Sequence, residues 1–219
     1  MYSLVMFDMD GVLFDSMPVH ARAWAGTFEG TGIEYEESEV YLYEGMTASA
    51  YVSMLFGIGE DDPKCIELCG RKSEILKTLP EPEAMKGAFE VLSAVKESGV
   101  PAIVVTGSAH RHMLDKVDKT YPGMFRTEWM VSAHDVRRGK PAPDPYLAGA
   151  AKAGVDPSRA IVVENAPMGV HAAHAAGCFV VAVNTGPLPD SSLLEEGADV
   201  LFHSMAELSG QIGKLISGQ

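Results

Sequence analysis

The stretch Leu4-Val5-Met6-Phe7-Asp8-Met9-Asp10-Gly11 decides the fold, because it reads as a short buried strand that stops abruptly at two carboxylates. Further short apolar runs follow it along the chain, at residues 102–105, 129–131 (the weakest), 160–163, 179–183 and 200–202. Runs that are apolar on both faces and rich in Val and Ile, with helical spacing between them, are typical of a parallel sheet covered on both sides. The sequence therefore predicts an α/β protein with a doubly wound, Rossmann-like parallel sheet.

A long interval separates the first apolar run from the second. Residues 11–101 lie between them, although a single crossover helix needs far fewer. Most of residues 15–83 has helical patterning, and Pro80-Glu81-Pro82-Glu83 is suited to a linker that returns the chain to the sheet. We therefore expect a core domain of residues 1–14 and 84–219, and a small helical cap domain of residues 15–83 inserted after the first strand.

Composition and charge exclude several classes of function. The 219 residues include 17 basic and 30 acidic side chains, and a formal net charge of −13 disfavours nucleic acid and anionic membranes as partners. The longest apolar run, residues 175–183, is too short to span a bilayer, and no signal peptide is recognisable. Three irregularly spaced cysteines fit a reducing compartment better than a disulfide framework. We expect a cytoplasmic protein that is a monomer.

Polar side chains stand at the ends of the predicted strands, where open α/β sheets bind their ligands. Asp8 and Asp10 are two positions apart, so one carboxylate can coordinate a cation and attack while the other exchanges protons with a leaving group and water. A hydroxyl next to Gly107 can hold phosphate oxygens, Lys140 supplies positive charge, and an acid–amide pair suits Mg²⁺. The remaining polar residues at these ends are Thr106, Ser108, Glu164 and Asn165. This set favours phosphoryl transfer through an aspartyl phosphate.

The motifs that carry these residues resemble the four signatures of the haloacid dehalogenase superfamily, in the order that the family has them. They are residues 7–16 (Phe-Asp-Met-Asp-Gly-Val-Leu-Phe-Asp-Ser), 105–108 (Val-Thr-Gly-Ser), 139–141 (Gly-Lys-Pro) and 162–170 (Val-Val-Glu-Asn-Ala-Pro-Met-Gly-Val). The helical insertion corresponds to the cap of the β-phosphoglucomutase-like branch, and His20-Ala21-Arg22-Ala23-Trp24 resembles a motif at the start of that cap. The resemblance implies the same core and cap architecture that the pattern of runs predicts.

The resemblance also implies a role for each matching residue. Asp8 would be the nucleophile and a metal ligand. Asp10 would be the general acid and base, with its backbone carbonyl on the metal, and Lys140 would balance charge. The other implied roles are phosphoryl binding by Thr106, Gly107 and Ser108, and Mg²⁺ binding by Asn165 directly and by Glu164 in the inner or outer coordination sphere.

Two departures from the family pattern bear on the substrate. Most members have Glu-Asp where this chain has Glu164-Asn165, so the expected metal site is one unit less negative. β-Phosphoglucomutases have a lysine and an arginine where the cap loop of this chain has Glu44 and Ala48, and that arginine holds the distal phosphate of the sugar. A sugar-phosphate mutase is therefore disfavoured.

The same positions resemble a Bacteroidetes-type inorganic pyrophosphatase subgroup of the family. There Glu44 would reach the metal and shrink the pocket, and Lys72 would reach a second phosphate. The resemblance at the start of the cap implies that His20 would relay protons. A loop acid, a solvated helix charge and a cap hydrogen bond are the plainer interpretations of these three residues.

We therefore expect a Mg²⁺-dependent phosphohydrolase for a small phosphorylated compound, foremost inorganic pyrophosphate. The alternatives among enzymes are a β-phosphoglucomutase and a sugar-phosphate phosphatase. Outside enzymes, the alternative is a phosphate- or metal-binding protein that retains the fold without its catalysis.

Overall fold

Five short strands form one parallel sheet with the order β2-β1-β3-β4-β5 in the computed structural model of the chain, which describes residues 1–108 and 111–218 and, for 111–114, the backbone alone. The strands are β1 (Leu4–Phe7), β2 (Ala102–Val104), β3 (Ala160–Glu164), β4 (Phe179–Val183) and β5 (Val200–Phe202). β1 pairs in parallel with both neighbours, and Phe7 lies opposite Val104 on one side and Val163 on the other. The chain reverses its direction of winding at β1, which confirms the predicted doubly wound sheet and puts its switch point at the end of β1.

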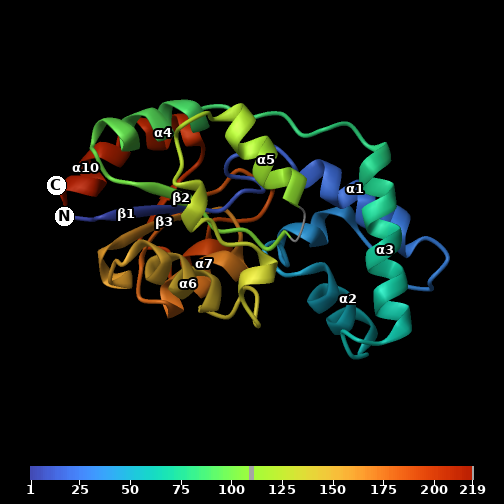
Figure 1. The fold of residues 1–219 in the computed structure, drawn as a ribbon. Helices are drawn as coiled ribbons and strands as arrows, with labels where there is room; N and C mark the ends of the chain where they lie inside the picture. Colours follow the sequence, from blue (N-terminus) through green and yellow to red (C-terminus); the bar gives the residue numbers. More distant parts are fainter. Residues whose placement is uncertain (109–110, 219) are drawn as a thin grey trace.

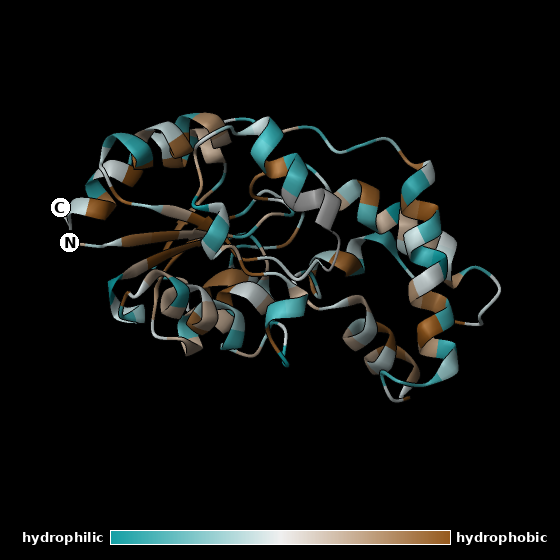
Figure 2. Ribbon diagram, viewed as in Figure 1, coloured by the Kyte–Doolittle hydropathy of each residue, from teal (hydrophilic) through white to brown (hydrophobic). Residues whose placement is uncertain are grey.

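Helices cover both faces of this sheet, with α4 and α10 on one side and α6 and α7 on the other (Figure 1). Because alternate residues of a strand point to opposite faces, Val5 and Phe7 pack toward α4, α9 and α10, whereas Leu4 and Met6 pack toward α6 and α7. The strands between these layers are apolar along their length (Figure 2). The helices of this part are α4 (Ala88–Glu97), α5 (Arg111–Thr120), α6 (Asp144–Ala153), α7 (Pro167–Ala175), α8 (Ser191–Leu194), α9 (Met205–Ser209) and α10 (Ile212–Ser217), with 3₁₀ turns η2 (Thr127–Trp129), η3 (Ala133–Asp135) and η4 (Pro157–Arg159).

A separate group of helices lies between β1 and α4 in the chain and beyond the end of the sheet in space (Figure 1). Its elements are α1 (Met17–Phe28), η1 (Glu37–Tyr41), α2 (Ala48–Phe56) and α3 (Pro63–Thr78). They pack around a hydrophobic cluster of their own, in which the Trp24 ring stacks on Phe28 at 5.1 Å and meets Tyr51 edge-on at 5.0 Å between centroids. On this ground we propose that residues 15–83 form a cap domain, whose boundaries stay a prediction.

One predicted strand is wrong. Residues 129–131 form no strand, because η2 occupies Thr127–Trp129 and only Val131 bridges the sheet, by pairing with Val105. The chain cannot continue in extended form, since Ser132 caps η3 immediately afterwards with a reciprocal hydrogen-bond pair involving Asp135. The loop that carries Lys140 therefore starts from a single bridge residue, Val131, and continues into η3.

Some expectations from composition can be compared with the structure. The three cysteines are free thiols, and Cys65 and Cys178 are buried. Within the described part of the chain, no helix has both the length and the apolar character that crossing a bilayer requires. The cytoplasmic location and the monomeric state stay predictions.

Gly87 is a position at which this packing requires glycine. It precedes α4 with φ of +92°, and a Cβ there would lie 2.3 Å from the backbone nitrogen of Ala206. Gly99, after the other end of α4, has φ of +74° but nothing within 4 Å of the place of a Cβ. We expect Gly87→Ala to lower the free energy of unfolding by about 3 kcal/mol or more and Gly99→Ala by about 1 kcal/mol, measured in urea. Equal losses would contradict the close contact between α4 and α9.

Candidate active site

The end of β1 carries the two aspartates that the sequence singles out. The backbone nitrogen of Asp8 still donates to the carbonyl of Val163 at 3.0 Å, so Asp8 is anchored in the sheet and is only 3% exposed. The chain then turns at Gly11, whose φ is +76° and whose Cβ, if present, would lie 2.1 Å from the Nδ2 atom of Asn165. Only glycine allows this turn to pass so close to the end of β3, and the turn brings Asp10 to the rim of the same site.

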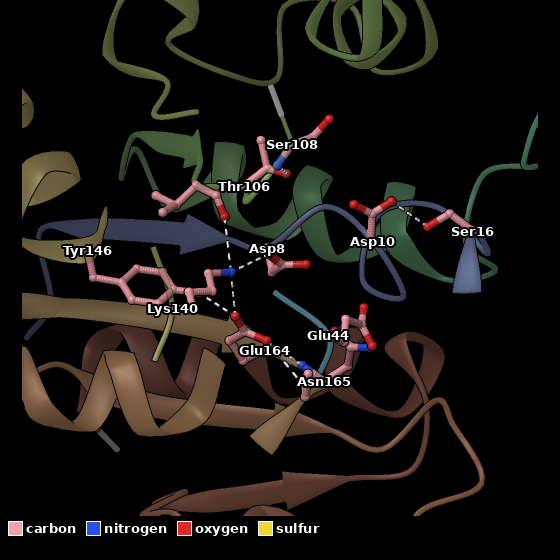
Figure 3. A network of polar contacts seen from close by, with 12 residues as sticks. Asp8, Asp10, Ser16, Glu44, Thr106, Ser108, Lys140, Tyr146, Glu164 and Asn165 are labelled. Carbon is pink, nitrogen blue, oxygen red and sulfur yellow. Dashed lines mark hydrogen bonds and ion pairs between the residues drawn. The ribbon is translucent and has the colours of Figure 1, made fainter. Parts of the chain in front are cut away.

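Lys140 is an enclosed cation between two carboxylates, and it is 2% exposed. Its Nζ atom forms ion pairs with Asp8 and, at 2.6 Å, with Oε1 of Glu164, and it donates to the carbonyl of Val105 at 3.3 Å (Figure 3). Burial opposes the charge, but Asp8 and Glu164 outweigh it and raise the pKa of Lys140 above its usual value. Burial also raises the pKa of Asp8, and Lys140 opposes that rise. Lys140 therefore stays protonated and fixes the direction of the Asp8 carboxylate.

Glu164 has donors on both of its carboxylate oxygens. Oε1 accepts from Lys140 and from the hydroxyl of Tyr146, each at 2.6 Å, while Oε2 accepts from the backbone nitrogens of Asn165 at 2.9 Å and Ala166 at 3.3 Å. Two donors on each oxygen use the lone pairs that a directly bound cation would need. The family resemblance leaves Glu164 in either the inner or the outer coordination sphere of Mg²⁺, and this arrangement favours the outer sphere.

Tyr146 is a site residue that the sequence reasoning missed. Its side chain is fully buried on α6, its ring lies 5.0 Å from Nζ of Lys140, and its hydroxyl reaches Glu164. In the sequence it occupies an apolar position of a helix, where a tyrosine reads as ordinary core. The available signal is its place in the first turn of the helix that follows the Lys140 loop, because side chains of a helix tilt toward its N-terminus and so toward the preceding loop.

Asn165 and Glu44 join the core to the cap. Nδ2 of Asn165 donates to Oε2 of Glu44 at 3.0 Å, and the two side chains are 6% and 7% exposed. Burial, together with the negative charge of Asp8, raises the pKa of Glu44 well above its usual value. The remaining oxygens, Oδ1 of Asn165 and Oε1 of Glu44, are buried and accept no hydrogen bond from the described residues. A pair of buried oxygens that lack donors is suited to a cation.

The oxygen atoms around this pair fit a magnesium ion. Oδ1 of Asn165 and Oε1 of Glu44 are hard donors of the type that Mg²⁺ prefers, and the Asp8 carboxylate is near enough for its charge to act on Glu44. The family resemblance adds the backbone carbonyl of Asp10 as an expected ligand. No group of three or more His, Cys, Asp or Glu side chains is arranged for a metal anywhere in the described residues. The fit therefore depends on an amide and a main-chain carbonyl as well as on carboxylates.

The loop after β2 carries the residues expected to bind the phosphoryl group. The Thr106 hydroxyl accepts from the backbone nitrogen of Ser108 at 3.0 Å, and Thr106 is 3% exposed. Gly107 lies against the cap, since a Cβ there would lie 2.5 Å from the carbonyl oxygen of Gly45. Gly107 and Ser108 face the cavity described below, whereas Thr106 lies behind them.

Asp10 points toward the first cap helix and away from Lys140 (Figure 3). The Ser16 hydroxyl donates to its Oδ1 at 2.6 Å, and Nε2 of His20 lies 3.3 Å from the same oxygen. Burial alone would raise the pKa of Asp10, but His20 and Ser16 outweigh it and bring the pKa down to about 2. Asp10 is thus a carboxylate at neutral pH as long as it keeps these two partners.

Lys72 reaches the site from α3. Its Nζ lies 4.3 Å from the ring centroid of Trp24, which is the geometry of a cation–π contact. Burial lowers the pKa of Lys72 to about 8, although the charge of Asp10 partly offsets this. The lysine therefore supplies positive charge on the cap side of the site at neutral pH.

A cavity of about 660 Å³ opens between the sheet and the cap helices. Of the residues expected in the site, it is lined by Asp8, Asp10, His20, Glu44, Lys72, Gly107, Ser108 and Lys140. Thr106, Glu164 and Asn165 do not line it and lie behind its wall, where they hold the lining residues in place. Most of the expected residues are thus brought to one place.

This fold and site define a class of enzyme. Residues 5–183 match the family described as haloacid dehalogenase-like hydrolase, and the chain belongs to that family. It is an enzyme of the phosphatase or phosphotransferase type, in the β-phosphoglucomutase-like branch.

Individual relatives narrow the comparison. Hexitol phosphatase A of Escherichia coli is 33% identical over 93% of this chain and 92% of its own. Validoxylamine A 7'-phosphate phosphatase of Streptomyces hygroscopicus is also 33% identical, over 95% and 96% of the two chains. A solved structure from Bacteroides vulgatus, provisionally described as a beta-phosphoglucomutase, is 42% identical with a TM-score of 0.93 over 99% of this chain and 89% of that one.

Tyr146→Phe tests the hydrogen-bond network beneath Lys140. We expect it to lower the free energy of unfolding by about 1–2 kcal/mol, because a charged acceptor loses a donor. We also expect a decrease in kcat of about tenfold with little change in KM, because Glu164 then holds Lys140 less firmly against Asp8.

Tyr121→Phe is the matched control, since its buried hydroxyl donates to the carbonyl of Leu13 at 2.5 Å, away from the cavity. It should lose comparable stability in urea and keep kcat. If both variants keep kcat, Tyr146 is merely structural.

Proposed function

We propose that this enzyme is a phosphohydrolase that removes the phosphoryl group of a small sugar or polyol phosphate by way of a phosphorylated Asp8. The observation that carries the proposal is the buried Lys140 between Asp8 and Glu164 at the switch point of the sheet. A nucleophilic carboxylate held in one direction by an enclosed cation is suited to in-line attack on phosphorus.

In the first half of the reaction, an oxygen of Asp8 attacks the phosphorus and the bond to the leaving oxygen breaks. Lys140 and the backbone groups around Gly107 and Ser108 stabilise the negative charge on the phosphoryl oxygens. Asp10 gives a proton to the leaving oxygen, which it can do only when protonated. Since Ser16 and His20 favour its ionised form, proton donation requires Asp10 to leave these two partners.

In the second half, water replaces the sugar and attacks the aspartyl phosphate. The ionised state of Asp10 allows this step, because a carboxylate can accept a proton from the attacking water without first losing one, and it becomes a stronger base once it leaves Ser16 and His20. Free phosphate leaves, and Asp8 is regenerated as a carboxylate beside Lys140.

We propose that Mg²⁺ is the cofactor, bound by Asp8, the carbonyl of Asp10 and Asn165. The buried oxygens of Asn165 and Glu44 without donors support this. When bound, the ion supplies charge neutralisation for the phosphoryl oxygens. A bound cation would favour the ionised form of Glu44 against its raised pKa, and Glu44 would then add the negative charge that an amide at position 165 does not bring. A cap residue would thus complete the site only when the cap lies against the core.

A sugar or polyol phosphate is the better supported substrate. Two relatives of about equal similarity are named for their action on a hexitol phosphate and on validoxylamine A 7'-phosphate. The cavity of about 660 Å³ has room for a substrate of that size. A β-phosphoglucomutase is the other enzyme considered for sugar phosphates. That activity has less support, because Ala48 cannot hold a distal phosphate.

Inorganic pyrophosphate, the substrate foremost in the sequence-based expectation, is the second candidate. It is favoured by one observation, the buried contact of Glu44 with Asn165, together with the cation of Lys72 across the site from Lys140. None of the relatives described above is named for this substrate.

A substrate panel tests the two candidates directly. With Mg²⁺ present, we expect kcat/KM for sorbitol phosphate to exceed that for pyrophosphate by about tenfold or more, measured as released phosphate. Asp8→Asn should lower turnover of both by about a thousandfold or more while thermal unfolding stays cooperative. A preference for pyrophosphate would favour the second candidate, and unchanged turnover in Asp8→Asn would exclude the aspartyl-phosphate route.

Asn165→Asp tests the metal site without relying on activity. In the absence of Mg²⁺ we expect a lower melting temperature, because the hydrogen bond to Glu44 becomes a contact between two carboxylates. Mg²⁺ should then raise the melting temperature more than in the wild type and bind about tenfold more tightly, because the site gains a charge.

Asn184→Asp is the matched control for this variant. Nδ2 of Asn184 also donates to a carboxylate oxygen, that of Asp190 at 2.7 Å, but Asp190 does not line the cavity, whereas Glu44, the partner of Asn165, does. It should lose stability without any added response to Mg²⁺. An equal response in the two variants would remove Asn165 from the metal site.

A further inference from the structure

The cavity extends into the cap, beyond the residues that the phosphoryl chemistry uses. Ser49 on α2, Glu60 in the turn between α2 and α3, and Ser73 on α3 line it there. That turn lies at the lower end of α3, opposite the end from which the chain returns to α4 (Figure 1). The phosphoryl group is therefore expected at one end of the cavity and the rest of the substrate at the other.

Glu60 is held by Ser49. The Ser49 hydroxyl donates to Oε2 of Glu60 at 2.5 Å, and Ser49 itself lies 3.3 Å, oxygen to oxygen, from the hydroxyl of Thr47, the N-cap residue of α2. This contact fixes one carboxylate oxygen and leaves Oε1 of Glu60 without a hydrogen bond among the described residues. An oriented carboxylate oxygen at the wall of a cavity is an acceptor for hydroxyl groups.

The charge at this end of the cavity discriminates between substrate tails. Within the described residues the exposed carboxylate of Glu60 forms no ion pair and is in contact with the uncharged Ser49. The cation of Lys72 lines the same cavity, but it lies on the ring of Trp24 and forms no ion pair with Glu60. A second phosphate would meet a carboxylate here, whereas a hydroxyl could donate to it. The carboxylate thus favours an uncharged tail and opposes a charged one.

We infer that Glu60, oriented by Ser49, binds hydroxyl groups in the uncharged tail of a sugar or polyol monophosphate and weakens the binding of substrates with a second phosphate. The inference rests on the proposed function, since it names the part of that substrate which the cap contacts. It assigns Glu60 to specificity, while Asp8 and Asp10 carry the chemistry.

Arg137 is a residue that would instead favour a substrate with a second phosphate. It lines the cavity from the loop that precedes Lys140, is exposed, and has no hydrogen bond or ion pair among the described residues. The neighbouring Arg138 is engaged with Asp144 at 2.8 and 3.0 Å. A substrate tail with a second phosphate would lie toward Arg137 on the core side, and a hydroxyl tail would lie toward Glu60 in the cap. The two placements give opposite substrate preferences.

Glu60→Gln in the Mg²⁺-loaded enzyme tests the inference, with sorbitol phosphate and fructose bisphosphate as substrates. The change removes the charge and keeps the shape. For sorbitol phosphate we expect KM to rise about tenfold at unchanged kcat, because a charge-assisted hydrogen bond is lost far from the reacting atoms. For fructose bisphosphate kcat/KM should rise about threefold or more, because the repulsion is gone. Ser49→Ala should change both values in the same direction but less.

Glu67→Gln is the matched control, because Glu67 is an exposed acid on α3 that does not line the cavity. It should leave both substrates unchanged. If Glu60→Gln acts like this control, or if the wild type prefers fructose bisphosphate, the inference is overturned while the proposed hydrolysis stands. If the wild type releases phosphate from neither compound, the proposed function and the inference fall together.

Discussion

The enclosed ammonium group of Lys140 is the constraint on which the rest of the site depends. A buried cation is tolerated only where its charge and its hydrogen atoms are matched, and Asp8, Glu164 and the carbonyl of Val105 meet that condition from three separate elements. The strand order that places β1 between β2 and β3 brings these groups together. Removing Lys140 would leave two buried carboxylates without a cation, so fold and chemistry are held in place by the same contacts.

Close backbone approach is the second requirement, because it allows the cap to share a site with the core. Gly11 passes against Asn165, and Gly107 passes against the carbonyl of Gly45. Side chains at either position would push the cap loop outward and separate Glu44 from Asn165. These glycines therefore connect the core machinery to a domain that packs around a hydrophobic cluster of its own.

The parts of this site that are local in the chain are those that sequence reasoning recovers. A buried run followed by Asp8 marks both the strand and the proposed nucleophile, and at the ends of β2 and β3 a buried run is likewise followed by polar residues of the candidate site. Residues 129–131 mislead because Ser132 offers a turn that competes with an extended strand. Tyr146 is missed because its hydroxyl meets Glu164 only after folding, and the contact of Glu44 with Asn165 joins residues 121 positions apart. The spacing of apolar residues along the chain gives no signal for contacts between side chains that lie so far apart in the sequence.

The cap and the site that it covers differ in charge. Residues 15–83 contain 5 basic and 14 acidic side chains, yet they cover a site for an anion. The attraction must therefore be short-ranged, and Lys140 beneath the phosphoryl position and Lys72 on Trp24 supply it. Beyond a Debye length from these two cations, the acidic surface repels any substrate in proportion to its charge. An acidic cap over a small cationic centre thus admits a single phosphate more readily than two, and the carboxylate of Glu60 applies the same preference inside the cavity.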